Sequence, residues 1–253
     1  MKALAIARYS LKKAAREKIF WLIPLVTIVV LALIQNLQFF DVGVRVKVLK
    51  DFGVTAISLF GFLVCLVVTV SLVPFERESR TIHFLFSKPV SRADFVVGKF
   101  ACVSALLAIN LAVVGLELVV LVRAYAGRWD LNLVKGLLLI YLKLELFASL
   151  VILLSVLMSM ALVVFMAILA YVVTHAVSLA ESSLSQGTPP FFQSLVHWAL
   201  ATLPDLTHYD TSDVVVHGHA IPYSYMGLLL VHTLAYVVLF LGLATWSLER
   251  TEL

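Results

Sequence analysis

Side chains of the kind that bind metal ions follow one another in a polar stretch near the C-terminus. They are His208, Asp210, Asp213, His217 and His219. Imidazole and carboxylate groups are ligands for zinc and other transition metals, and the His217-Gly-His219 spacing is suggestive. The overall spacing matches no strong metal motif, so we expect no metal site and keep these five residues as weak candidates. The alternative is a polar loop that contacts a neighbouring helix or another protein.

Signatures of catalysis are absent from the sequence. It contains no His-Glu-x-x-His, Gly-x-Ser-x-Gly or Cys-x-x-Cys motif, and its carboxylates are scattered. The Gly98-Lys99 pair lacks the upstream glycine and the following hydroxyl residue of a phosphate-binding P-loop. We therefore predict that the chain is not an enzyme and that it binds no cofactor itself.

The composition is that of a membrane protein. Of the 253 residues, 62% are hydrophobic and 13% are charged, and the mean hydropathy is +1.05. A soluble domain is nearer half apolar and a quarter charged, and a disordered chain is more polar still. These values exclude a water-soluble enzyme and a disordered protein. The net charge of +4 then reflects basic residues at a membrane surface, with no nucleic acid as partner.

The apolar runs predict an all-α protein that crosses the lipid bilayer six times in a single domain. The expected spans are residues 19–40, 54–75, 96–122, 136–155, 159–180 and 226–248. As one helix, residues 136–180 would be roughly 68 Å long, at about 1.5 Å per residue. The hydrocarbon core is only about 30 Å thick, so this stretch must reverse, and Ser155 to Ser159 is the expected turn.

Three charged residues, Glu117, Lys143 and Glu145, lie inside these apolar runs. A charge at such depth is costly, so it usually faces a cavity or an opposite charge. Glu117 and Lys143 come at similar depth in consecutive spans that run in opposite directions. They predict either an ion pair that holds two helices in register or a part of a substrate pathway.

The distribution of Lys and Arg predicts a multi-pass protein of the cell inner (plasma) membrane with both termini in the cytoplasm. The cytoplasmic segments then hold Lys2, Arg8, Lys12, Lys13, Arg16, Lys18, Arg77, Arg80, Lys88, Arg92, Lys99 and Arg250. The outer segments hold Arg45, Lys47, Lys50, Arg123, Arg128 and Lys135. Residues 181–223 contain no Lys or Arg and form the expected outer loop.

Two amphipathic helices are expected beside the spans. In residues 1–18, Arg8, Lys12 and Arg16 form a basic stripe, while Leu4, Ala7, Leu11 and Ala14 lie on another face. Such a helix lies in an anionic membrane interface, and the alternative is an ordinary basic anchor for the first span. Within the outer loop, the apolar positions from 192 to 203 predict a second interfacial helix before the last span.

The segment of residues 76–95 is both charged and aromatic. A short helix over residues 81–86 is stopped by Pro89, and Ser91 with Asp94 has the spacing of a helix N-cap. The segment presents Ile82, Phe84 and Phe86 beside the membrane. Apolar residues rimmed by charge predict a docking surface for another protein. The alternative is a solvated loop between two helices.

Residues 76–99 resemble the signature of ABC-transporter permeases of the type-2 exporter class. The resemblance lies in the acidic start, Thr81, the Lys88-Pro-Val-Ser-Arg92 stretch and the closing Gly98-Lys99, although Arg80 stands where glycine is usual. The basic N-terminal helix, six spans and large outer loop fit the same layout. The nearest resemblance is to permeases encoded beside a separate ATPase, including those similar to the copper-enzyme maturation permease.

This resemblance implies a permease of an ATP-driven exporter that docks a cytoplasmic ABC ATPase, which holds ATP and Mg²⁺, and pairs with a second copy as a homodimer. The implied ATPase-coupling residues are Glu76, Arg77, Glu78, Arg80, Thr81, Phe84, Pro89, Ser91 and Arg92. The alternative function is a membrane anchor or mechanical transducer that docks an ATPase, transports nothing and signals to a periplasmic or outer partner. A passive channel fits the docking segment poorly.

Overall fold

The computed structural model describes residues 2–14, 18–34, 42–72, 91–183 and 206–250, and every regular element in these ranges is helical. The elements are α1 (Lys2–Ala14), α2 (Lys18–Ile34), α3 (Val42–Leu72), α6 (Arg92–Ala126), α7 (Leu131–Leu157), α8 (Met160–Ser183), η1 (Thr207–Tyr209), α10 (Ser212–Val216) and α11 (Tyr223–Arg250). The expected all-α class is confirmed for this part of the chain.

Four of these helices, α3, α6, α7 and α11, are long and apolar enough to cross a membrane. Shorter apolar stretches, Trp21–Leu33 and Met160–Thr174, lie in α2 and α8. Each of the four long helices has a most apolar stretch of 18 residues. This stretch is 67% buried in α7 but only 22% buried in α11. The exposed side of α11 carries Leu228, Val231 and Val238, as expected of a helix that faces lipid. The chain is a multi-pass membrane protein.

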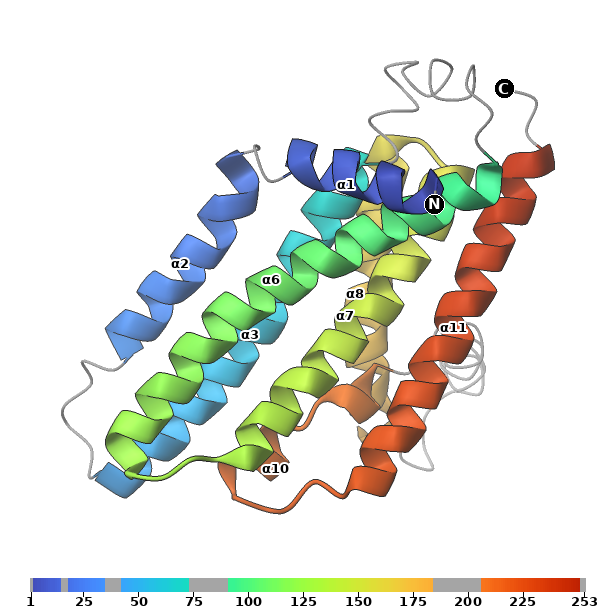
Figure 1. Ribbon diagram of the computed structural model, residues 1–253. Coiled ribbons are helices and arrows are strands. Elements are labelled where there is room, and N and C mark those ends of the chain that lie inside the picture. The colour runs from blue at the N-terminus through green and yellow to red at the C-terminus, as the bar shows by residue number, and fades with distance from the viewer. Residues whose placement is uncertain (1, 15–17, 35–41, 73–90, 184–205, 251–253) are drawn as a thin grey trace.

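The helix α7 is the centre of the bundle and packs against α3, α6, α8 and α11 (Figure 1). At one end of the bundle α3 ends, α6 begins and α11 ends, and α1 lies across this end (Figure 1). We call it the α1 end. The opposite end, with α10, the turn between α6 and α7 and the start of α11, is the α10 end (Figure 1). The first and last described residues therefore lie at the same end of the bundle.

Close approaches and stacked rings fix α3 against its neighbours. A Cβ added at Gly53 would lie 2.5 Å from the end of the Leu118 side chain of α6, so a larger residue here would displace that side chain. Further along α3, the ring of Phe62 stacks on Tyr171 of α8 at 3.8 Å and meets Phe147 of α7 edge-on at 5.1 Å. These contacts join α3, α7 and α8 into one core.

Helix boundaries differ from the sequence expectation mainly in α3. This helix starts at Val42, well before residue 54, so the segment expected outside the membrane is helical and includes Arg45, Lys47 and Lys50. The break between α7 and α8 falls at Met158, which has extended backbone, inside the stretch where a turn is expected. The α6 helix ends at Gly127, whose φ of 70° is the left-handed conformation that glycine adopts at low cost.

Candidate functional site at the two ends of the bundle

The start of α6 shows the N-cap that the sequence predicts. Ser91 has extended backbone, and its hydroxyl accepts a hydrogen bond from the backbone N–H of Asp94 at 3.0 Å. The same hydroxyl donates to Asp94 Oδ2 at 2.7 Å. A carboxylate in the first turn also stabilises the positive end of the helix dipole. The direction of α6 is therefore set at the residue that follows segment 76–90.

Arg92, the first residue of α6, connects this helix to α11. Its guanidinium donates a hydrogen bond to the backbone carbonyl of Leu248, near the end of α11. The last carbonyls of a helix lack donors within the helix, so an arginine satisfies one of them and complements the dipole. Beside this contact, Phe95, Val96 and Leu248 belong to a small apolar cluster that also includes Ile152 and Val156 of α7.

Lys99 connects α6 to α1. The side chain is 1% exposed, and its ammonium group donates to Ser10 Oγ of α1 at 3.0 Å. The ring of Phe95 lies 5.4 Å from the same ammonium group, within range of a cation–π contact. Ala7, Ser10 and Ala14 are the buried face of α1, whereas Leu4 is exposed. Three residues of the expected apolar face, Ala7, Leu11 and Ala14, therefore pack against the bundle, where α1 lies on α6.

Most of the expected coupling residues fall outside the ranges that the structure describes. They are Glu76, Arg77, Glu78, Arg80, Thr81, Phe84 and Pro89. Ser91 and Arg92 are described and lie together at the start of α6. The two helix ends that flank this segment, the end of α3 at Leu72 and the start of α6 at Arg92, both lie at the α1 end (Figure 1).

Inside the bundle, Lys143 is directed toward α3 and α8. It is 2% exposed, its ammonium group lies 3.5 Å from Ser58 Oγ, and it is 5.7 Å from the ring centre of Tyr171. Glu117 Oε2 has no hydrogen-bond partner among the described residues. The structure therefore does not bring Glu117 and Lys143 together as an ion pair.

Glu145 belongs to a different polar group, on the side of α7 that faces α6. Tyr141, one turn before Glu145 on α7, shares a hydrogen bond of 2.8 Å with the hydroxyl of Ser104 in α6. Glu145 Oε1 is buried, and within the described ranges it has no hydrogen-bond partner. Lys143 and Glu145 thus lie in separate surroundings, although they are only two positions apart in α7.

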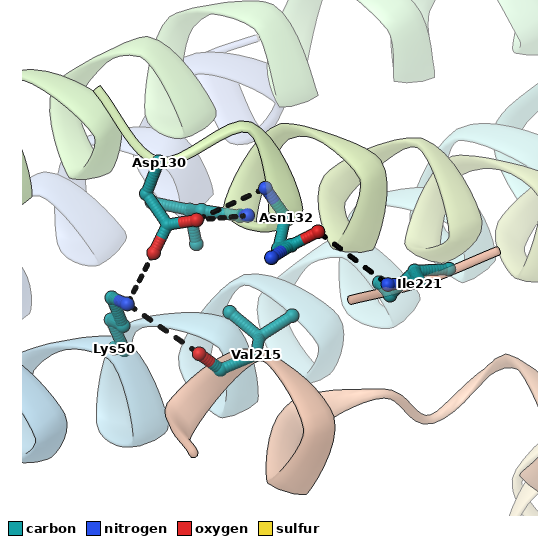
Figure 2. A network of polar contacts seen from close by, with 6 residues as sticks. Lys50, Asp130, Asn132, Val215 and Ile221 are labelled. Atoms are coloured by element: carbon teal, nitrogen blue, oxygen red, sulfur yellow. Dashed lines mark hydrogen bonds and ion pairs between the residues drawn. The ribbon is translucent and has the colours of Figure 1, made fainter. Parts of the chain in front are cut away.

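At the α10 end, Lys50 joins three elements (Figure 2). Its ammonium group pairs with Asp130 and donates to the backbone carbonyl of Val215 in α10 at 3.5 Å. Asp130 also caps α7, because its carboxylate accepts from the backbone N–H groups of Asn132 at 3.0 Å and Leu133 at 3.3 Å. Burial acts to raise the pKa of Asp130, but the hydrogen bond and charge of Lys50 and the two N–H groups outweigh it and hold the pKa below its ordinary value.

Further contacts hold residues 206–222 against the bundle. The amide oxygen of Asn132 accepts from the backbone N–H of Ile221 at 3.5 Å (Figure 2), and Lys135 donates to the carbonyl of the same residue at 2.8 Å. Tyr209 is fully buried, and its hydroxyl lies 2.9 Å from His232 Nδ1 and 2.8 Å from Thr233 Oγ1 of α11. Burial raises the pKa of Tyr209. This part of the expected outer loop is therefore packed into the bundle.

The weak metal candidates do not converge in the part of the chain that the structure describes. No group of three or more His, Cys, Asp or Glu side chains there is arranged to hold a metal ion. His217 and His219 have ring centres 6.4 Å apart, and His217 Nδ1 lies 2.9 Å from the carbonyl of Asp213. The backbone carbonyl of His208 accepts a hydrogen bond from the Tyr225 hydroxyl at 2.6 Å.

Sequence reasoning missed the partners of these contacts. From the sequence, Lys50 is counted among the cations of the outer segments, and neither Asp130 nor Ser10 is singled out. The one local signal was the Asp130-Leu131-Asn132 stretch, because Asp is a preferred N-cap residue. The remaining contacts join residues far apart in the chain.

Comparison with known families gives one match that covers nearly the whole chain. The family model described as ABC-2 family transporter protein matches residues 4–253. No curated protein matches the chain significantly.

Proposed function

The chain belongs to the ABC-2 family of transporter proteins, and we propose that it is the permease subunit of an ATP-driven exporter. A separate cytoplasmic ABC ATPase supplies the ATP and Mg²⁺ chemistry, and two permease subunits form the membrane-spanning unit. The α1 end faces the cytoplasm of the inner membrane, in agreement with Arg8, Lys12 and Lys13 on α1. The closer likeness to permeases of copper-enzyme maturation stays a prediction from the sequence.

The observation that carries this proposal is the attachment of α6 at the α1 end. Segment 76–90 leads directly into the N-cap of α6, and the first two turns of α6 contact α11 through Arg92 and α1 through Lys99. A helix transmits displacement along its axis because its backbone is fully hydrogen-bonded. Movement of the segment by a docked ATPase therefore acts on three helices at once.

Energy coupling then follows from differential affinity. An ATPase dimer that closes on ATP and binds one arrangement of the segment more tightly shifts the permease toward that arrangement. By linkage, the permease state changes the affinity of the ATPase for ATP by the same factor. Each cycle would displace α6 and its neighbours and release an amphipathic substrate on the outer side.

The alternative function, a mechanical transducer that transports nothing, has support of its own. Residues 206–222 are joined to α3, α7 and α11 by Lys50, Lys135 and Tyr209. A partner bound to this loop on the outer side would feel a movement of those helices. Transport of a substrate in reconstituted vesicles separates the two functions, because only the exporter produces it.

The test is co-purification of the detergent-solubilised chain with the ABC ATPase encoded beside it, followed by measurement of ATP hydrolysis. The wild-type chain should retain the ATPase and change its rate of hydrolysis. Glu76→Ala should lose both effects, because it removes the acidic start of the docking segment. Glu249→Ala is the matched control, since this exposed carboxylate also lies at the α1 end.

The variants must elute as folded protein for the comparison to hold. If the wild type and Glu76→Ala retain the ATPase equally, the start of segment 76–90 is not part of the docking surface. Absence of binding by the folded wild type would contradict the exporter and the transducer together.

A further inference from the structure

An apolar groove with a volume of about 460 Å³ lies between α6 and α7, which are consecutive, antiparallel helices (Figure 1). Its lining includes Ala112, Gly115 and Leu116 of α6 together with Val134 and Leu138 of α7. Leu116 and Leu138 are exposed, so the groove opens toward the lipid. The volume is within the range of about 300–1,000 Å³ that is usual for small-molecule sites in proteins.

The length of the groove matches the depth of one leaflet of the bilayer. On α6 the groove extends from Ala108 to Val119. At about 1.5 Å per residue this distance is roughly 17 Å along the helix axis. Half of a hydrocarbon core of about 30 Å is about 15 Å. The groove therefore has the length that one acyl chain of a lipid needs if the headgroup of that lipid lies at the α10 end.

Arg123 marks the end of the groove that lies at the α10 end. It follows Val119 by one helical turn and Leu116 by two, so it is on the same face of α6 as the groove. Its guanidinium lies 3.9 Å from the ring centre of Trp129, in the turn that leads to α7. Trp129 is 61% exposed and Leu131 is 70% exposed. Exposed apolar groups beside a tryptophan are typical of the membrane interface, so this turn is at the level of the lipid headgroups.

The charge at this end of the groove is positive. Arg123 and Arg128 are both exposed, and within the described ranges neither of them is part of an ion pair. The acid of the same turn, Asp130, is already paired with Lys50 and caps α7. An arginine that stacks on an aromatic ring keeps the edge of its guanidinium available, and the N–H groups of this edge fit two oxygens of a phosphate.

We propose that the groove between α6 and α7 binds an anionic phospholipid, with one acyl chain in the groove and the phosphate on the guanidinium of Arg123. Arg128 adds a second positive charge beside the phosphate. The phosphate belongs to a lipid rather than to a free ion, because the cation adjoins an apolar groove of acyl-chain length and only a lipid occupies both. This site is separate from the contacts at the α1 end and does not depend on the ATPase.

The test compares two photoreactive lipids that carry the same diazirine on one acyl chain. One is phosphatidylglycerol, which is anionic, and the other is phosphatidylcholine, whose choline cancels the charge of its phosphate. The chain is reconstituted in phosphatidylcholine nanodiscs with a small fraction of either probe, irradiated and digested, and the labelled residues are found by mass spectrometry. Relative to label on the exposed side of α11, phosphatidylglycerol should label the groove at least about fivefold more than phosphatidylcholine, as expected for one cation at a membrane surface.

Two variants separate a bound lipid from the lipid that surrounds any membrane protein. Arg123→Gln removes the charge and should lower the preference for phosphatidylglycerol about fivefold. Arg250→Gln is its matched control, because Arg250 lies over the ring of Trp246 at the α1 end, with 4.1 Å to the ring centre. Ala112→Trp fills the groove and should abolish labelling there, whereas Ala161→Trp, at an exposed alanine of α8, should not.

Three results would overturn the proposal. The first is label spread evenly over all lipid-facing helices with either probe, which means surrounding lipid alone. The second is an unchanged preference for phosphatidylglycerol in Arg123→Gln. The third is label in the groove only when the chain is monomeric, which means that a second copy covers the groove. Thermal unfolding of each variant confirms that it is folded.

Discussion

At the α10 end a single lysine joins three elements, whereas at the α1 end two different side chains of α6, Arg92 and Lys99, contact α11 and α1. Lys50 of α3 pairs with the residue that caps α7 and also donates to the backbone of α10. At the other end, Arg92 joins α6 to α11, and Lys99 joins α6 to α1. Loss of Lys50 at the α10 end should thus disturb three elements together, whereas loss of Lys99 at the α1 end should act first on α1.

This difference suggests how the bundle divides its tasks. The α10 end keeps α3, α7 and residues 206–222 in one arrangement, because charge, helix cap and backbone contacts support one another. At the α1 end, α1 and α11 are held to α6 by different side chains. We therefore expect the α1 end to receive movement from a docked partner and the α10 end to hold its shape.

The largest effect is expected from Lys50→Met. The substitution leaves the Asp130 carboxylate without its cation and removes a donor from the Val215 carbonyl. Breaking a buried ion pair costs about 3–5 kcal/mol, and because Asp130 is partly exposed we expect about 2–3 kcal/mol here. Chemical unfolding in detergent measures the loss. The control is Lys47→Met, an exposed lysine one turn away on α3, and equal losses in the two variants would contradict the α10-end account.

Lys99→Met should have a smaller and more local effect. It removes the hydrogen bond to Ser10 and keeps the apolar stem, so a loss of about 1–2 kcal/mol is expected. Hydrogen exchange should rise in α1 and stay unchanged in α7 and α10. Lys12→Met, an exposed lysine of α1, provides the control. Faster exchange throughout the bundle would show that the α1 end is as interlocked as the α10 end.

Tyr209→Phe tests how firmly the loop is held to α11. The variant loses the hydroxyl contacts to His232 and Thr233, while the ring remains buried. We expect a loss of about 1 kcal/mol in unfolding free energy, together with faster exchange in residues 207–216. Tyr9→Phe, at an exposed position of α1, should leave both quantities unchanged.

The smallest effect appears only in acid. Because the pKa of Asp130 is lowered in the folded state, its pair with Lys50 stabilises the fold fully above the ordinary aspartate value of about 3.9. That contribution is lost as the pH falls through the lowered pKa. Unfolding measured from pH 6 to pH 2 should show this loss in the wild type and less of it in Asp130→Asn. Identical acid profiles would exclude the pair as its source.

Local patterns in the sequence predicted the helical class, the Ser91 cap of α6 and the reversal between α7 and α8. Each depends on residues within a few positions of one another, where periodicity and helix capping apply. The contacts that distinguish the two ends do not. Lys50 and Asp130 are 80 positions apart, and Ser10 and Lys99 are 89 apart.

The early start of α3 also depends on contacts between residues that are far apart in the chain. Arg45, Lys47 and Lys50 indicate a loop outside the membrane when only the sequence is considered. In the folded chain Lys50 is paired with Asp130, and the guanidinium of Arg45 lies 5.6 Å from the ring centre of Tyr125. Tertiary contacts thus stabilise basic residues within a helix that extends past the apolar run.

The most direct test measures distances at both ends while the proposed ATPase binds ATP. Spin labels at Leu4 and Glu249 report on the α1 end, and labels at Arg128 and Ala220 report on the α10 end; all four residues are exposed. The native Cys65 and Cys102 are buried and should not react with the label. We predict that ATP changes the Leu4–Glu249 distance and leaves the Arg128–Ala220 distance unchanged. A constant Leu4–Glu249 distance, or an equal change at the α10 end, would contradict the account.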